Sequence, residues 1–101
     1  MLNTLTTVTR TDGWENIAHL SANKKYTLSF KVDKKSIINV HLHDSNGKCL
    51  QALPVYGNFF IANKKYTFPI ITTNGGYLAI HVDNGDEEEE ITIYEICVEE
   101  N

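Results

Sequence analysis

Cysteine, proline and long apolar stretches are scarce in this sequence of 101 residues, which contains two cysteines and two prolines. Cys49 and Cys97 match no metal-binding spacing and sit among apolar or β-forming neighbours, so we expect two buried free thiols rather than a disulfide. The longest apolar run, residues 59–62, is far shorter than the roughly 20 residues of a membrane helix. The chain does not open on a basic segment followed by an apolar stretch. The sequence therefore predicts neither a membrane partner nor a secretory signal.

Positive charge is also limited. Nine Lys and Arg residues stand against thirteen Asp and Glu residues, which gives a formal net charge of −4, and most of the lysines occur as separate pairs. Binding through phosphate neutralisation needs a clustered basic surface. We therefore predict no nucleic-acid partner.

Patterns that signal catalysis are missing as well. The serines lie in no Gly-x-Ser-x-Gly turn, and no glycine-rich phosphate loop is present. The acidic residues crowd into residues 83–90 and the C-terminus, whereas glycoside hydrolysis needs two carboxyl groups held about 5–9 Å apart in a cleft. We predict that the protein is not an enzyme and uses no cofactor.

The sequence does contain repeated alternation of apolar and polar residues, bounded by turn residues, which predicts β-strands. A single domain over residues 1–101 with an all-β fold accounts for this pattern, namely an antiparallel β-sandwich or jelly roll of about eight strands. The first two clear strands are expected to form a hairpin or otherwise to lie side by side. The expected strands cover residues 26–32, 38–43, 49–55, 66–71, 77–83 and 91–99, with an ill-defined strand at residues 4–9.

Three irregularities refine this pattern. Pro69 cannot donate a backbone hydrogen bond, which places its strand at the edge of a sheet. The apolar positions of the last strand change phase, and a β-bulge near residues 93–94 would explain the change. Apolar residues three apart within residues 10–21 allow a single helical turn, but the Asp-Gly turn signal before Trp14 favours a loop there.

An internal repeat relates two parts of the chain. Residues 22–27, Ala-Asn-Lys-Lys-Tyr-Thr, recur letter for letter as residues 62–67, and residues 38–43 match residues 78–83 at the same offset. Two explanations are open at this point: a sandwich built from two similar halves, or two turns that obey the same local rules.

The strand at residues 23–32, Asn-Lys-Lys-Tyr-Thr-Leu-Ser-Phe-Lys-Val, resembles the early Tyr-Thr-x-Ser-Phe strand of carbohydrate-binding modules of the family 4/9 type, which have a galactose-binding-like jelly roll. Residues 66–68, the following Thr-Thr-Asn-Gly-Gly loop and residues 77–82 resemble the second half of such a module. Residues 91–99 resemble its closing strand, so the resemblance covers roughly residues 14–101. Modules of this kind are also common in the structural proteins of tailed bacteriophages.

The resemblance implies where a ligand would bind. In that fold the strands that carry His41 and His81 are expected to be neighbours in the sheet whose outer surface binds sugar. Sugar recognition needs flat aromatic platforms and fixed polar groups. The ligand-binding residues that follow from this expectation are Trp14, Asn39, His41, His43, Tyr77, His81 and Asp83. The aromatic residues that either line the rim of this site or close the ends of a small core are Trp14, Tyr56, Phe59, Phe60 and Tyr77.

The histidines also suggest metal chemistry. His41 and His43 point to the same side of a strand, and with His81 and Asp83 they could bind a transition metal. Exposed histidines on a polar face are usually solvated or lie in a subunit contact, and the acidic run at residues 83–90 lacks the spacing of a calcium loop. We therefore predict no metal site and a solvated acidic loop.

The leading hypothesis is a non-catalytic binding or structural module, an accessory protein of a phage particle that decorates the capsid or tail and adheres to surface glycans. Its partners would then be phage capsid or tail proteins. Its location would be the virion after assembly in the host cytoplasm, and decoration of threefold positions would make it a homotrimer. The alternatives are a free-standing bacterial carbohydrate-binding lectin and a small module that binds only other proteins.

Overall fold

The computed structural model describes residues 4–9, 14–55, 57–82 and 91–101, with side chains described for all but residues 4–9. Within these residues the chain forms nine strands, which confirms the all-β prediction with one strand more than expected. None of the described residues belongs to a helix long and apolar enough to cross a membrane. The strands are β1 (Thr4–Thr9), β2 (Glu15–Leu20), β3 (Lys25–Val32), β4 (Ser36–His43), β5 (Cys49–Ala52), β6 (Asn58–Phe60), β7 (Tyr66–Ile71), β8 (Gly76–Val82) and β9 (Thr92–Glu100).

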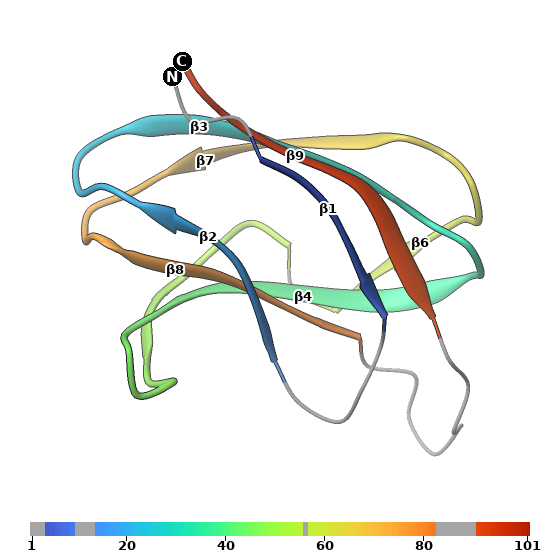
Figure 1. The fold of residues 1–101 in the computed structure, drawn as a ribbon, viewed down its shortest axis with the longest axis horizontal. Coiled ribbons are helices and arrows are strands. Elements are labelled where there is room, and N and C mark those ends of the chain that lie inside the picture. Colours follow the sequence, from blue (N-terminus) through green and yellow to red (C-terminus); the bar gives the residue numbers. More distant parts are fainter. Residues whose placement is uncertain (1–3, 10–13, 56, 83–90) are drawn as a thin grey trace.

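The strands form two antiparallel sheets that lie face to face (Figure 1). The four-stranded sheet has the order β1-β9-β3-β7, and the five-stranded sheet has the order β2-β8-β4-β5, with β6 also paired to β4. This is the antiparallel β-sandwich that the alternation predicts. Pro69 lies in β7, an edge strand, as its missing N–H requires.

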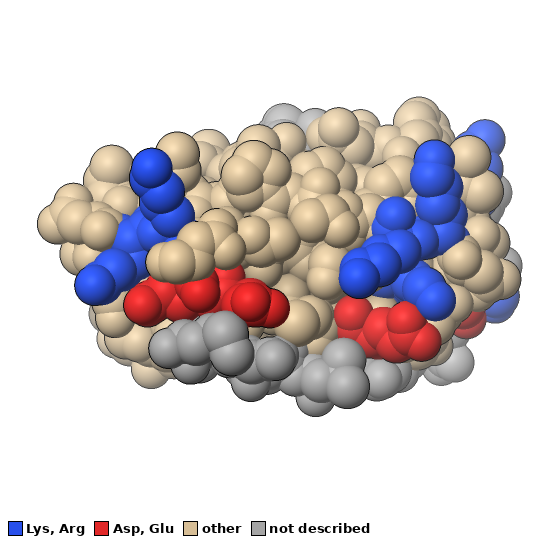
Figure 2. Space-filling model, turned by 90° about the horizontal axis from the view of Figure 1, so that it is seen from above, with Lys and Arg blue, Asp and Glu red and all other residues tan. Residues whose placement is uncertain are grey.

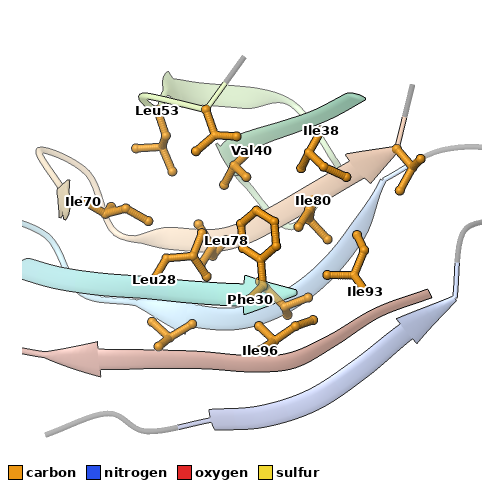
Figure 3. Packing of buried hydrophobic residues seen from close by; sticks show 14 of the residues in the cluster. Leu28, Phe30, Ile38, Val40, Leu53, Ile70, Leu78, Ile80, Ile93 and Ile96 are labelled. Atoms are coloured by element: carbon orange, nitrogen blue, oxygen red, sulfur yellow. The ribbon is translucent and has the colours of Figure 1, made fainter. Parts of the chain in front are cut away.

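The apolar faces of the two sheets meet in one core. In β3, β4 and β8 alternate side chains point inward, because successive residues of a strand face opposite sides of the sheet. Figure 3 shows the ring of Phe30 between the sheets, with aliphatic side chains from both sheets around it. Full burial of one such side chain contributes about 1.5–3 kcal/mol, so this core supplies most of the stability of the fold.

The strand β2 corrects the expectation of a loop over residues 10–21. Its pairing with β8 contains a β-bulge between Asn16 and Ala18. A bulge adds one residue to one strand, so Ile17 and Leu20 both reach the core although they are three positions apart. Because of the bulge, the buried residues of β2 are three positions apart instead of two. The alternation that predicts a strand is therefore absent from this part of the sequence.

Strands β3 and β4 lie in opposite sheets, so the expected hairpin between them was wrong. The chain crosses between the sheets after Asp33. The backbone N–H of Asp33 donates to the carbonyl oxygen of Thr92 at 3.0 Å, and the N–H of Thr92 donates to Oδ1 of Asp33 at 2.8 Å. These two bonds hold the end of β3 against the start of β9, while β4 continues beside β8 in the other sheet.

The predicted bulge in the last strand is present and is centred on Glu95. The register of β9 shifts there against both of its neighbours, and Glu95 has a positive φ of 50°. The extra residue lets Ile93 and Ile96 both face the core, whereas Tyr94 is partly exposed instead of sharing the buried side with Ile96. An ion pair of 3.0 Å between Lys31 and Glu95 lies across the bulge.

The internal repeat corresponds to an approximate twofold arrangement of strands. The repeated strands pair with each other, β3 with β7 in one sheet and β4 with β8 in the other. Leu28 lies opposite Phe68, and Val40 lies opposite Ile80, so each of these residues faces the residue forty positions later. The two halves of the repeat are therefore related by an axis that passes near both pairs.

The two copies of the repeated turn also have the same conformation. Asn23 and Asn63 both adopt positive φ, 58° and 61°, a region that asparagine tolerates better than most residues. The hydroxyl oxygens of Tyr26 and Tyr66 each accept a hydrogen bond from the backbone N–H five residues earlier, at 2.8 Å and 2.9 Å. The repeated sequence thus gives the same asparagine conformation and the same tyrosine hydrogen bond at both places.

Charged side chains are divided into separate groups on the face that Figure 2 shows from above. Lysines gather towards its two ends, and acidic side chains lie beside each group. The middle of this face, in the part that the structure describes, is uncharged. This face therefore presents acidic side chains beside its lysines instead of a continuous basic surface.

Candidate functional site

Five of the seven residues predicted to bind a ligand lie on the outer face of the five-stranded sheet, which is turned away from the core. Asn39, His41 and His43 alternate with core residues along β4, and Tyr77 and His81 do so along β8. The two strands are neighbours, as predicted, with Asn39 opposite His81 and His43 opposite Tyr77. The sequence pattern thus placed these side chains correctly on one face.

Trp14, which immediately precedes β2, covers part of this face. Its ring lies 4.3 Å from that of His41 with an interplanar angle of 19°, and 5.1 Å from that of His81 with an angle of 27°. The ring of His43 is tilted by 58° at a centroid distance of 4.8 Å. We call Trp14, His41, His43 and His81 the ring cluster. Trp14 remains partly exposed at its surface.

Two of the predicted ligand residues are buried, contrary to the expectation of a solvated face. Asn39 is 8% exposed and His43 is 4% exposed. The Oδ1 atom of Asn39 accepts a hydrogen bond of 2.6 Å from the backbone N–H of Gly57, so this amide holds the segment before β6. His43 lies against the indole of Trp14. Both side chains support the face from within, so neither is a primary contact for a large ligand that lies on this face.

A small residue, Ala79, lies on the outer face between residues of the ring cluster. Ala79 lies opposite His41 in the register and between Tyr77 and His81 along β8. It is fully buried although it points outward. A larger side chain at this place would compete with the rings for space. Ala79 thus contributes to the ring cluster through its small size.

The histidine rings of the cluster are partly or fully buried, and two of their nitrogens lie close together. Nε2 of His43 lies 3.3 Å from Nδ1 of His41, so one of these atoms donates a hydrogen bond to the other. Burial lowers the pKa of His41, and the nearby charges of His43 and His81 lower it further. Nδ1 of His81 is buried and has no hydrogen-bond partner among the described residues. The surroundings therefore favour the neutral imidazole of His41.

Two further rings lie on the same outer face. His19 of β2 lies opposite Tyr77, and their rings meet edge to face with centroids 5.1 Å apart. Phe59 of β6 lies opposite Ile37 on the outward side of β4 and is 65% exposed, with Nζ of Lys35 5.2 Å from its centroid. Sequence reasoning missed His19 because β2 was not predicted. The alternation along β4 could have placed Phe59 if the pairing of β6 had been known.

Of the remaining aromatic and acidic residues singled out in the sequence, only Phe60 lies within the described residues. Phe60 is buried and packs against Phe30, so it closes the core. Asp83, Tyr56 and the acidic run at residues 83–90 lie outside the described residues.

Both cysteines are free, as predicted, but the expectation that they are buried was wrong. Cys49 is exposed because it begins the edge strand β5, and Cys97 is partly exposed. The sulfur of Cys49 and one ring nitrogen each of His41 and His43 all lie within 4.8 Å of one another. A set of two imidazoles and one thiol is therefore present at one end of the ring cluster.

Comparison with known proteins identifies the fold. No model of a known protein family matches the chain, and no curated protein matches it in sequence. A structure described as BiXyn10A CBM1 APO matches with a TM-score of 0.54 and 17% identity, over 87% of this chain and 60% of the other. The CBM22-1 xylan-binding domain from Paenibacillus barcinonensis Xyn10C matches with a TM-score of 0.55 and 11% identity, over 98% of this chain and 92% of the other.

These similarities show that the chain has the fold of carbohydrate-binding modules. The chain spans only 60% of the length of the first of these structures, but it spans nearly all of the second. The predicted module fold is thereby confirmed, whereas membership of the family 4/9 type stays a prediction. Both similar structures are named as binding modules.

Proposed function

We propose that the chain is a non-catalytic carbohydrate-binding module that binds glycans on the outer face of its five-stranded sheet. The observation that carries this proposal is Trp14, a partly exposed ring held flat on His41 and His81 in a fold shared with carbohydrate-binding modules. Flat aromatic rings present an apolar surface on which the C–H faces of sugars stack. A ring that is already held in place loses little conformational freedom when the ligand binds.

Phe59 supplies a second aromatic surface on the same face. It lies opposite Ile37, four residues before His41 along β4, which corresponds to about 13 Å at a rise of about 3.3 Å per residue. A glycan of several units could contact Trp14 and Phe59 together. One structural neighbour is described as xylan-binding, so xylan oligosaccharides are the first ligands to test.

Calorimetric titration with a glycan panel that includes xylan oligosaccharides tests the proposal. We expect micromolar-to-millimolar binding and a loss of at least about tenfold in affinity for Trp14→Ala, equivalent to about 1.4 kcal/mol. Tyr94→Ala, a partly exposed ring on the four-stranded sheet, is the matched control and should bind as the unaltered protein does. No binding across the panel, or equal binding by Trp14→Ala, would contradict the proposal.

A place on a phage particle, with capsid or tail proteins as partners, is a finer proposal that rests on the sequence resemblance alone. Electron microscopy of purified virions should find the chain at regular positions, and its absence from virions would exclude this role. A solution mass of three chains is expected for the homotrimer, and the mass of one chain would count against it. The lectin alternative is favoured if glycan binding is found without virion association.

A further inference from the structure

We propose that His41, His43 and Cys49 form a binding site for a divalent transition-metal ion, with Zn²⁺ as the expected occupant. Each residue offers one ligand atom, and these three atoms all lie within 4.8 Å of one another. Neutral imidazole and thiolate are the ligands that proteins use most for Zn²⁺. The proposal reverses the sequence-based expectation of solvated histidines, and it does not depend on glycan binding.

A β-bulge brings Cys49 to the histidines. Along β4 and β5, His41 pairs with Ala52 and Leu42 with Gln51, so regular pairing would set His43 opposite Leu50. The register shifts at this point, and His43 lies opposite Cys49 instead. Residues directly opposite each other in an antiparallel pair share one face of the sheet. The bulge therefore turns a thiol, in place of an aliphatic side chain, towards the imidazoles.

The spacing of the two histidine nitrogens fits a metal ion. Two nitrogens bound to tetrahedral Zn²⁺ at about 2.0–2.1 Å lie roughly 3.3–3.4 Å apart. Nδ1 of His41 and Nε2 of His43 are 3.3 Å apart. Without an ion, one nitrogen must carry a hydrogen and donate it to the other. With an ion bound, that ring takes its other neutral tautomer, and both lone pairs point to the metal.

The hairpin that carries all three ligands is held by its own turn. Oδ1 of Asp44 accepts hydrogen bonds from the backbone N–H groups of Asn46 and Lys48, at 2.8 Å and 3.0 Å. The N–H of Asp44 also donates to the carbonyl oxygen of Lys48 at 2.9 Å, and Gly47 adopts a positive φ of 82°. The ligands thus come from nine consecutive residues whose backbone is fixed, so little ordering is needed for binding.

Burial and access are also suited to metal binding. His43 is buried and His41 stacks on Trp14, which limits the motion of both rings. Cys49 is exposed, so an ion can enter from that side. Binding releases the thiol proton to solvent, because the thiolate is the metal ligand. Three protein ligands leave one tetrahedral position for a water molecule.

Titration with Co²⁺, a spectroscopic probe for such sites, tests the proposal on untagged protein freed of metal by a chelator. We expect one equivalent of Co²⁺ to bind, with a thiolate-to-cobalt charge-transfer band in the near ultraviolet and tetrahedral d–d bands in the visible. Zn²⁺ should displace Co²⁺ and remove both features. Cys49→Ser should abolish the charge-transfer band, and His41→Gln should weaken Co²⁺ binding at least tenfold.

Matched controls separate this site from other thiols and imidazoles. Cys97→Ser and His19→Gln should bind Co²⁺ as the unaltered protein does, because neither side chain belongs to the proposed site of His41, His43 and Cys49. Cys49 and His41 are chosen for substitution because both are at least partly exposed, and circular dichroism verifies that each variant folds. The absence of the charge-transfer band, or its persistence in Cys49→Ser, would overturn the proposal. Failure to bind glycans would leave these results unaffected.

Discussion

The indole ring of Trp14 lies nearly parallel to the imidazole ring of His41, with centroids 4.3 Å apart and planes inclined by 19°. This contact joins the residue before β2 to the strand β4, which is separated from β2 in the sheet by β8. The outer face of the sheet therefore depends on a side chain from a distant part of the sequence.

We predict that His41 titrates below the ordinary histidine pKa of about 6.5. Its burial is the main cause, so Trp14→Ala should return the pKa towards the ordinary value. In the unaltered protein the pKa of His41 is lower in the folded state than in the unfolded state, so the unfolded chain binds the proton more tightly. The contribution of His41 to stability is therefore complete above its unfolded pKa. It decreases as the pH falls towards the folded pKa. An NMR titration of chelator-treated protein measures this pKa, and a value above 6.5 would refute the assignment.

The buried Nδ1 atom of His81, which has no hydrogen-bond partner among the described residues, leads to a prediction about stability. His81→Phe should keep the stacking on Trp14 and remove a buried polar atom, so stability in urea should be unchanged within about 1 kcal/mol or should rise. His43→Phe is the comparison, because it removes the hydrogen bond to His41 and should cost about 1–3 kcal/mol. Equal losses in the two variants would show that Nδ1 of His81 is bonded.

The repeated tyrosines provide a matched pair of substitutions. Tyr26→Phe removes a hydrogen bond in a partly buried turn and should cost about 1 kcal/mol, whereas the equivalent bond of Tyr66 is exposed and Tyr66→Phe should cost about 0.5 kcal/mol or less. Denaturant unfolding of both variants measures the difference. A larger loss for Tyr66→Phe would contradict the role of burial in this prediction.

Gly75, which precedes β8, and Gly76, the first residue of β8, should respond differently to substitution by alanine. A Cβ atom at Gly76 would lie 2.7 Å from the carbonyl oxygen of His43, and backbone must move to accept it, so Gly76→Ala should destabilise by about 1–3 kcal/mol. A Cβ atom at Gly75 would meet nothing closer than 3.4 Å, the carbonyl oxygen of Leu20, so Gly75→Ala should change stability little. Thermal unfolding compares the two, and equal melting temperatures would contradict the crowding at Gly76.

Much of the outer face could be predicted from the sequence because it depends on local alternation. The period of two along β4 and β8 correctly placed His41 and His81 together, and Pro69 correctly marked an edge. The parts that could not be predicted depend on irregular or distant contacts. The bulge at Ile17 breaks the alternation in β2, so that strand was not predicted. The bulge in β5 determines which residue lies opposite His43.

The burial of outward-facing residues also could not be predicted from the alternation of apolar and polar residues. Alternation shows which side a residue points to, but not whether another segment covers that side. Asn39 and His43 are buried by the loop at Gly57 and by Trp14, both of which come from elsewhere in the chain. The crossing after Asp33 likewise depends on hydrogen bonds to Thr92, 59 residues later.

The register of the repeated strands has a consequence for how a ligand would meet this surface. His41 and His81 are forty positions apart, and their strands cross the approximate axis at the opposed residues Val40 and Ile80. Trp14 stacks on both histidines but belongs to neither copy of the repeat. The approximate axis thus relates two of the rings that contact the indole, those of His41 and His81, but Trp14 itself has no counterpart, so the two directions along this surface are not equivalent. A polymer with distinct chain ends, lying along this face, would have a preferred direction.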